Sequence, residues 1–340
     1  MNPDQAPEKR PAAEERAAAA DLSHVDAQLD AARSKTIFAD LSHCGLIRFS
    51  GDDARDFLNG QLSCDVAGLE PWHARYGSYS TPQGRMLASF LLWREAAVFF
   101  MQLPGSMREA TQQRLAMHIL RSKVKAEDAS AAHVLIGVAG KDAAGILSPL
   151  FAELPGEPLS LTNTEGASVL RLAADRYQII ASPERAPALR SALDRDAVSA
   201  GPAVWDWLDI RAGIPFIMPA TREQFVPQMA NLDAIGGVSF NKGCYPGQEI
   251  VARMHYLGRL KQRMYLASVA ADVAPQPGDK LYSAGTGAQA CGTVVNAAAA
   301  PDGGFDMLAV MQIESAQQGD VHWKSPEGPR LKFMELPYSI

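Results

Sequence analysis

The residues best suited to chemistry gather in one turn-rich segment. Four glycines and one proline lie between Gly236 and Gly247, and a cysteine, Cys244, stands among them. Glycine lets a backbone approach a ligand closely or adopt a positive φ, and proline fixes the direction in which the chain leaves. The segment therefore predicts tight turns that present a partly accessible thiol. Turns that serve the fold alone would explain the same glycines, and composition leaves both interpretations open.

Cys244 has neighbours that would make its sulfur reactive. Lys242 is two residues away, and a cation within reach favours the thiolate, which is the nucleophilic form of cysteine. If Pro246 and Gly247 open a helix, its N-terminus favours the thiolate further. The nearest histidine in the sequence, His255, follows eleven residues later, so the sequence assigns no general base. The alternative is a cysteine that only fills space as a small apolar side chain.

The other histidines and cysteines are weaker candidates. His43 next to Cys44, and His73, have no second ligand at a spacing typical of metal sites, so we expect no metal site. The four cysteines are too few and too scattered for a disulfide framework: Cys44, Cys64, Cys244 and Cys291. Cys244 is therefore the cysteine whose surroundings indicate a function.

The composition is that of a globular protein. Its 340 residues are 47% hydrophobic and 21% charged, which suits two or three domains. The formal net charge of −6 provides no basic excess for phosphates, so we expect no direct nucleic-acid partner. No apolar run approaches the roughly 18 residues of a membrane helix, and the first residues lack the features of a signal peptide. We therefore expect a cytoplasmic protein without a membrane partner.

Three regions differ in composition and in the secondary structure that their patterns predict. Residues 1–33 are rich in Ala, Glu and Arg and have almost no bulky apolar side chains, so they predict a flexible tail. Residues 34–258 alternate strand and helix patterns, which predicts a mixed α+β body. Residues 259–340 contain six short strands between turns, which predict a small antiparallel barrel or sandwich. The strands are Met264–Val269, Lys280–Ser283, Ala290–Val295, Phe305–Ile313, Val321–Lys324 and Leu331–Leu336.

Local signals within the body predict particular elements. The apolar runs Met86–Trp93 and Ala96–Leu103 predict a hairpin of buried strands. Ser106 with Glu109 forms a capping box, which predicts a helix that begins there. A further helix is predicted after Ser182-Pro183, with a stripe of apolar side chains spaced three and four residues apart, Ala186, Leu189 and Leu193.

The sequence resembles the YgfZ-like folate-binding proteins, which are relatives of the glycine-cleavage aminomethyltransferase, or T-protein. The signature Lys-Gly-Cys-Tyr-x-Gly-Gln-Glu matches Lys242 to Glu249. The resemblance covers the chain from about residue 36 to its end. Further agreement lies in Gly60–Leu62, Asp65–Val66, Gly137–Gly140, Phe225–Gln228, Asn231–Leu232 and Leu336–Ser339.

This resemblance implies an α+β fold with a ring-like, T-protein-type body around a tetrahydrofolate site, followed by a C-terminal antiparallel β-barrel. It implies an accessory factor that assembles or repairs iron–sulfur clusters, including those of tRNA-modifying enzymes. The implied partners are the iron–sulfur assembly machinery or its client enzymes. Cys244 would be the functional thiol. The implied cofactor-binding residues are Lys242, Tyr245, Gln248, Glu249, Arg253, Arg263 and Arg211, and Lys261 lies in the same basic region.

Two departures from the family pattern keep alternatives open. Ala88 and Ser89 stand where the T-protein has a pair of aspartates, so an aminomethyltransferase is disfavoured. Arg211 stands where a glutamate usually pairs with the pterin edge, and a guanidinium offers only donors. Arg211 could instead meet the glutamate tail of folate. A thiol-redox or scaffold protein that does not bind folate is the third interpretation.

Overall fold

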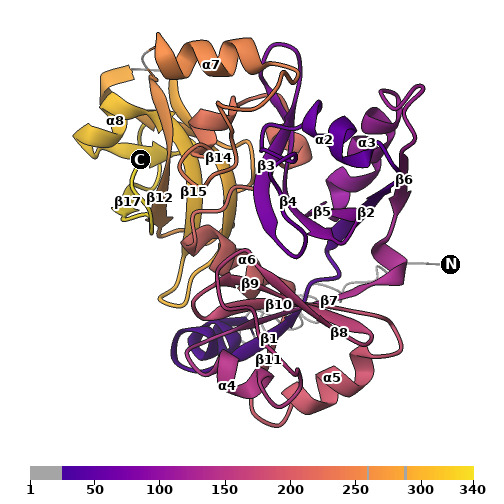
Figure 1. Ribbon diagram of the computed structural model, residues 1–340. Coiled ribbons are helices and arrows are strands. Elements are labelled where there is room, and N and C mark those ends of the chain that lie inside the picture. Colours follow the sequence, from indigo (N-terminus) through magenta and orange to yellow (C-terminus); the bar gives the residue numbers. More distant parts are fainter. Residues whose placement is uncertain (1–24, 259, 287–288) are drawn as a thin grey trace, which may run out of the picture.

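The structure, a computed structural model, describes residues 25–258, 260–286 and 289–340. Three β-sheets form three lobes at the corners of a triangle (Figure 1). Helices pack against the sheets and on the segments that connect them. The α+β class and the ring-like arrangement predicted from the sequence are confirmed.

The first lobe is a five-stranded antiparallel sheet that contains the predicted hairpin. Both faces of its second strand are covered, since every residue from Met86 to Trp93 is buried. The helix predicted after Ser106 is confirmed, but the capping box is wrong: Pro104 is the N-cap and no side chain caps the helix. In order the strands are β3 (Ala74–Ser80), β4 (Met86–Glu95), β5 (Val98–Pro104), β2 (Cys44–Ser50) and β6 (Lys125–Asp128), with helices α2 (Ala54–Asn59) and α3 (Gly105–Ala116) and the 3-10 turn η1 (Ser130–Ala132).

The second lobe is a six-stranded sheet with two helices. The predicted stripe on the second helix is confirmed, because Ala186, Leu189 and Leu193 are buried in one cluster with strand residues such as Ile136 and Ile179. In order the strands are β11 (Val198–Ala200), β1 (Ile37–Asp40), β7 (Val134–Ala139), β10 (Arg176–Ala181), β9 (Ala167–Ala173) and β8 (Leu161–Thr164), and the helices are α4 (Ala143–Leu147) and α5 (Ala186–Leu193).

The third lobe is the C-terminal sheet, and all six predicted strands are confirmed. Every neighbouring pair is antiparallel, and the sheet curls strongly into a half-barrel. In order the strands are β16 (Val321–Trp323), β13 (Lys280–Ser283), β14 (Ala290–Ala299), β15 (Phe305–Gln312), β12 (Gln262–Val269) and β17 (Leu331–Met334), with α8 (Ile313–Gln318) and η4 (Ala284–Thr286) beside them.

Helix α6 (Pro202–Arg211) lies where the lobes meet, because it packs against β14 and β15 of the half-barrel and against β1 of the second lobe (Figure 1). The chain then passes through η2 (Pro219–Thr221) and η3 (Pro227–Ala230) to α7 (Gln248–Tyr256), which lies across the top of the molecule in this view.

Part of the predicted tail is packed. Residues 25–34 are helical, and Leu29 is fully buried in a cluster with Trp205 of α6. The packed structure therefore begins before residue 33, while residues 1–24 lie outside the described residues. No helix within the described ranges is long and apolar enough to cross a membrane.

Candidate functional site

The signature loop, residues 242–249, is anchored by Lys242. The Lys242 Nζ atom donates hydrogen bonds to the carbonyl oxygens of Asn59, Leu62 and Cys64, at 2.5, 2.6 and 2.9 Å. An ammonium group has three donors, so these three acceptors satisfy it fully. Burial lowers the pKa of Lys242 to about 8. Lys242 was expected to stand as a cation beside Cys244, and its charge is directed into the first lobe instead.

Tyr245 forms a second anchor of the loop. Its side chain is buried, and the Lys242 Nζ atom lies 5.0 Å from the centre of its ring, which suits a cation–π contact. Burial raises the pKa of Tyr245 to about 12, so the phenol is neutral at physiological pH. Its hydroxyl is buried and has no hydrogen-bond partner among the described residues.

Gly247 forms the third anchor, against the turn between β3 and β4. Its φ is +83°, and a Cβ atom placed on it would lie 2.5 Å from the Gly84 Cα atom and 2.6 Å from the Thr81 carbonyl oxygen. Only glycine fits such a conformation and so close an approach. The glycine of the signature is thus required by packing between two segments of backbone, which supports the fold-serving interpretation of the turns.

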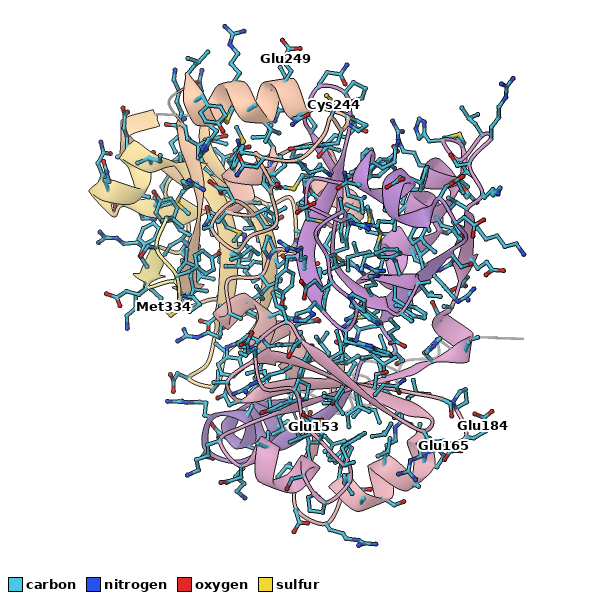
Figure 2. All side chains as sticks on the ribbon, viewed as in Figure 1. Glu153, Glu165, Glu184, Cys244, Glu249 and Met334 are labelled. Carbon is cyan, nitrogen blue, oxygen red and sulfur yellow. The ribbon has the colours of Figure 1, made fainter. Side chains whose placement is uncertain are left out.

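Cys244 is the exposed member of this loop (Figure 2). It lies four residues before α7, the helix predicted after Pro246 and Gly247 and found at Gln248–Tyr256. Glu249 is exposed in the first turn of this helix. His255 stacks on Phe240 with ring centres 3.8 Å apart. The loop therefore turns its lysine and tyrosine inward and its thiol outward.

The remaining predicted cofactor-binding residues fall into separate places. Arg263 is engaged internally: its guanidinium donates to both carboxylate oxygens of Asp233, at 2.7 and 3.0 Å. Gln248 is half-buried, and Arg253 and Lys261 are exposed. Arg211 lies elsewhere, with its Nη1 atom 3.7 Å from Asp306 and 2.8 Å from the Met334 sulfur. Figure 2 shows Met334 well apart from Cys244.

A second group of functional character, which we name the central polar cluster, lies between the lobes and escaped the sequence analysis. It consists of Tyr76, Gln102, Arg176, Gln178 and Asp209. Arg176 of β10 donates to Asp209 of α6 at 2.6 Å, and their side chains are only 9% and 13% exposed. The guanidinium also lies 4.6 Å from the ring centre of Trp205.

The charges of this cluster are held in a poorly solvated place. Burial raises the pKa of Asp209, while the neighbouring Arg176 opposes the rise. Burial also raises the pKa of Tyr76, and the Asp209 carboxylate adds to the effect. The Arg176 Nε atom is buried and has no hydrogen-bond partner in the described part of the chain. Buried charges are costly and such groups gather at functional sites, so this cluster is a candidate binding site.

Gln102 and Gln178 extend the cluster across two lobes. The Gln178 Nε2 atom donates to Gln102 Oε1 at 2.6 Å, and both side chains are almost fully buried. Gln102 interrupts the apolar strand Val98–Leu103, and Gln178 interrupts Tyr177–Ala181. A polar residue within an otherwise apolar strand is the sequence signal that could have identified each glutamine. It does not reveal that the two strands lie next to each other.

Ala88 and Ser89, at the positions of the expected acidic pair, serve packing. Both are buried in β4. The Ser89 hydroxyl donates to the Pro215 carbonyl oxygen at 2.8 Å and accepts from the Ile217 N–H at 2.9 Å. Neither side chain titrates near neutral pH, so neither can exchange a proton with a substrate there.

Comparisons with known proteins agree with this architecture. A profile of the GCVT N-terminal domain matches residues 9–182. The "tRNA-modifying protein YgfZ" of Sodalis glossinidius (strain morsitans) is 32% identical over 305 residues, which span 88% of this chain and 92% of the relative. The protein of the same name from Klebsiella pneumoniae (strain 342) is 31% identical over 303 residues, with the same coverage of each chain, 88% and 92%. The chain belongs to the YgfZ family.

The fold of this YgfZ-family chain is that of the T-protein superfamily. The crystal structure of glycine cleavage system aminomethyltransferase T from Bartonella henselae superposes with a TM-score of 0.75, at 20% identity. The match covers 92% of this chain and 89% of the other. The likeness concerns the arrangement of the three lobes, since identity at this level carries the fold alone.

Proposed function

We propose that this chain is a tetrahydrofolate-binding accessory protein for the assembly or repair of iron–sulfur clusters, with Cys244 as its functional thiol. It would support iron–sulfur enzymes, including those that modify tRNA. The observation that carries this proposal is the exposed Cys244 on a loop that Lys242, Tyr245 and Gly247 fix from beneath. The names of the curated relatives, tRNA-modifying proteins, agree with the proposed clients.

The geometry of the signature loop favours a partner that approaches from outside. A thiolate sulfur is a soft ligand that suits iron–sulfur chemistry. A cysteine held rigidly at the surface can meet a sulfur or an iron atom that another protein carries, whereas a buried cysteine cannot. The partners would accordingly be the iron–sulfur assembly machinery or its client enzymes.

The central polar cluster carries acceptors and donors of the kind that would bind the pterin of tetrahydrofolate. A pterin presents several N–H donors beside a carbonyl oxygen, and the Asp209 carboxylate can accept from such donors. The Arg176 Nε atom, which has no hydrogen-bond partner among the described residues, offers a donor in the same place. Arg211 at the edge of the half-barrel would meet the carboxylates of the glutamate tail, and Gln248, Glu249 and Arg253 stay candidates for further contacts. When bound, tetrahydrofolate would supply a carrier of one-carbon units.

Complementation tests the thiol. In cells that lack the protein, Cys244→Ser should fail to restore iron–sulfur enzyme activity, because a hydroxyl is neither a comparable nucleophile nor a soft ligand. Cys291→Ser is the matched control, since this buried thiol lies beside the hydroxyls of Ser283 and Ser315. Equal rescue by both variants would show that the thiol of Cys244 is incidental.

Calorimetric titration of tetrahydrofolate under anaerobic, reducing conditions tests the cofactor. Asp209→Asn should bind about tenfold more weakly or worse, because it replaces a carboxylate acceptor with an amide. Asp40→Asn, at a partly exposed ion pair with Arg190, should bind as the unaltered protein does. If the unaltered protein does not bind tetrahydrofolate, the interpretation that remains is a thiol-redox or scaffold protein that does not bind folate. An unchanged affinity in Asp209→Asn would mean that the pterin binds elsewhere.

A further inference from the structure

A second cysteine has a histidine and a carboxylate beside it. Cys44 begins β2, His43 precedes it, and Asp206 comes from α6. The His43 Nε2 atom lies 3.7 Å from the Cys44 sulfur and 3.2 Å from the Asp206 Oδ1 atom. Cys44 is half-buried, and the His43 side chain is 31% exposed. Small molecules in solution can therefore reach the group.

The arrangement suits an ion pair and differs from a hydrolytic triad. In a triad the carboxylate and the nucleophile bind opposite nitrogens of the imidazole ring, so that a proton can be relayed. Here both lie at Nε2, and the His43 Nδ1 atom is buried without a partner among the described residues. One ring nitrogen therefore faces both the Asp206 carboxylate and the Cys44 sulfur.

The electrostatics of His43 point the same way. Burial alone would lower the pKa of His43, but its hydrogen bonds to Asp206 and Cys44 raise it to about 10. Further charged groups near this site are Asp209, one turn further along α6 and paired with Arg176, and Arg108 of α3, which packs against Gly45 and pairs with Asp128. An imidazolium beside a cysteine favours the thiolate.

We propose that Cys44 is a second reactive thiol, activated by His43 and Asp206, whose substrates are small oxidants of the hydrogen peroxide class. The Cys44 thiolate attacks one peroxide oxygen, an S–O bond forms and the O–O bond breaks. Cysteine is oxidised by two electrons to a sulfenic acid. The hydroxide that leaves takes the proton of the His43 imidazolium and becomes water, so atoms and charges balance.

The rate of thiol alkylation tests the proposal, measured with iodoacetamide at pH 7 in a Cys244→Ser background that removes the exposed thiol. Mass spectrometry of the Cys44 peptide gives its rate separately from the other cysteines. In the folded protein Cys44 should react about tenfold faster than in the same protein unfolded in urea, because the fold supplies Asp206 and fixes the ring. Hydrogen peroxide followed by dimedone should label Cys44 as a sulfenic acid adduct.

Variants assign the effect to the proposed groups. His43→Gln and Asp206→Asn should each slow the alkylation of Cys44 by about tenfold, whereas His73→Gln, a histidine that contacts the Pro71 carbonyl, should leave it unchanged. Slower reaction in the folded than in the unfolded chain would overturn the proposal and identify Cys44 as a packed side chain. That comparison needs no substitution at His43 or Asp206, so it decides even where those variants fail to fold.

Discussion

The signature loop and the central polar cluster differ in how the chain assembles them. The loop is eight consecutive residues, and most of its distinctive side chains hold the loop in place: Lys242 satisfies three carbonyls and Gly247 fits against a backbone turn. The cluster joins residues from β3, β5, β10 and α6. Its buried ion pair is not the most stable arrangement for this position, because apolar residues of similar volume would avoid the free-energy cost of desolvating two charges.

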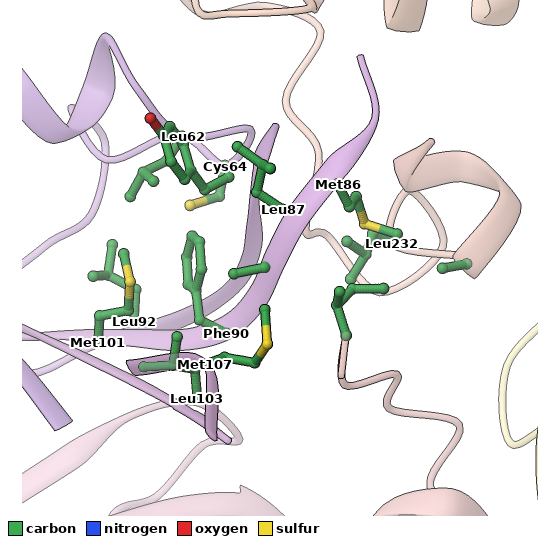
Figure 3. Packing of buried hydrophobic residues seen from close by; sticks show 14 of the residues in the cluster. Leu62, Cys64, Met86, Leu87, Phe90, Leu92, Met101, Leu103, Met107 and Leu232 are labelled. Carbon is green, nitrogen blue, oxygen red and sulfur yellow. The ribbon is translucent and has the colours of Figure 1, made fainter. Parts of the chain in front are cut away.

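This difference shows that the distinctive residues of a sequence motif need not all take part in function. Some of them serve only to hold the motif in its conformation. In the loop the proposed chemistry rests on one exposed side chain, Cys244, while Lys242, Tyr245 and Gly247 hold the loop in place. In the cluster every member is polar, and the core that supplies the scaffolding includes Leu91, Phe100 and Trp205, with Tyr76 packed against it. The opposite face of β4 and β5 packs on a separate apolar core that contains Phe90, Leu92 and Met101 (Figure 3). Variants in the two regions should accordingly separate stability from function.

The largest effect is expected at the buried ion pair. Asp209→Ala leaves the Arg176 guanidinium buried without its counter-ion, which should lower the free energy of unfolding by about 3–5 kcal/mol. Urea denaturation followed by tryptophan fluorescence measures this. The control is Asp40→Ala, whose pair with Arg190 has side chains 42% and 41% exposed, so its loss should cost no more than about 1 kcal/mol.

A double substitution sharpens this result. Arg176→Met combined with Asp209→Leu removes both charges, and apolar replacement of a buried pair is often neutral or stabilising. The double variant should therefore be more stable than Asp209→Ala while it loses folate affinity. A double variant as unstable as the single one would mean that the pair supports the fold, and the contrast with the signature loop would disappear.

The next effect is expected within the loop itself. Gly247→Ala should cost about 2–4 kcal/mol, because alanine is strained at this positive φ and its Cβ atom would meet the Gly84 backbone. Gly243 is a matched control in the same loop: a Cβ atom there meets nothing within 4 Å. Gly243→Ala should change the free energy of unfolding by less than about 0.5 kcal/mol. Equal losses in thermal melts of the two variants would contradict the packing role.

The sequence predicted those parts of the fold that local patterns determine. The C-terminal strands and the β4–β5 hairpin are apolar runs between turns, and local signals suffice for them. Strand β6, Lys125–Asp128, is polar and lies at the edge of its sheet beside β2, so its backbone pairing leaves no apolar pattern to read. The packing of Leu29 was missed because residues 1–33 were judged by their overall composition, although Leu22, Val25 and Leu29 recur at the three- and four-residue spacing of a helix face.

The site was predictable to the same extent. Cys244 and its exposure follow from its position among turns. The partners of Lys242 are carbonyls about 180 residues earlier in the chain, and spacing within the signature cannot reveal them. Gln102 and Gln178 meet only because two lobes pack together. Contacts that tertiary structure creates are the part that required coordinates.

A smaller effect is expected from His43 as the pH rises. Its pKa is raised from 6.5 to about 10, so its contribution to stability is complete below pH 6.5 and disappears as the pH passes through 10. The partners are partly exposed, with side chains 31% and 51% accessible, so the contribution should be roughly 1 kcal/mol or less.

Lys242 acts in the opposite direction. Its pKa is lowered to about 8, so its contribution makes the protein more stable as the pH rises above that value.

To separate His43 from Lys242, the measurement is the difference in unfolding free energy between the unaltered protein and His43→Gln, taken at intervals from pH 6 to 10. The difference should shrink steadily over this range. A constant difference would show that the His43–Asp206 pair makes no pH-dependent contribution.

The smallest effect on stability is expected at Cys244. Its side chain is exposed, so Cys244→Ala and Cys244→Ser should each alter the free energy of unfolding by less than about 0.5 kcal/mol. Cys64 is the instructive counterpart, because it is fully buried and Cys64→Ala leaves a cavity that should cost about 1 kcal/mol or more. Parallel denaturation curves of the three variants make the comparison. If Cys244→Ser loses as much stability as Cys64→Ala, unfolding alone would explain its loss of function in cells. Cys244 would then be a stabilising residue of its loop, like Lys242 and Gly247, and the contrast between them would disappear.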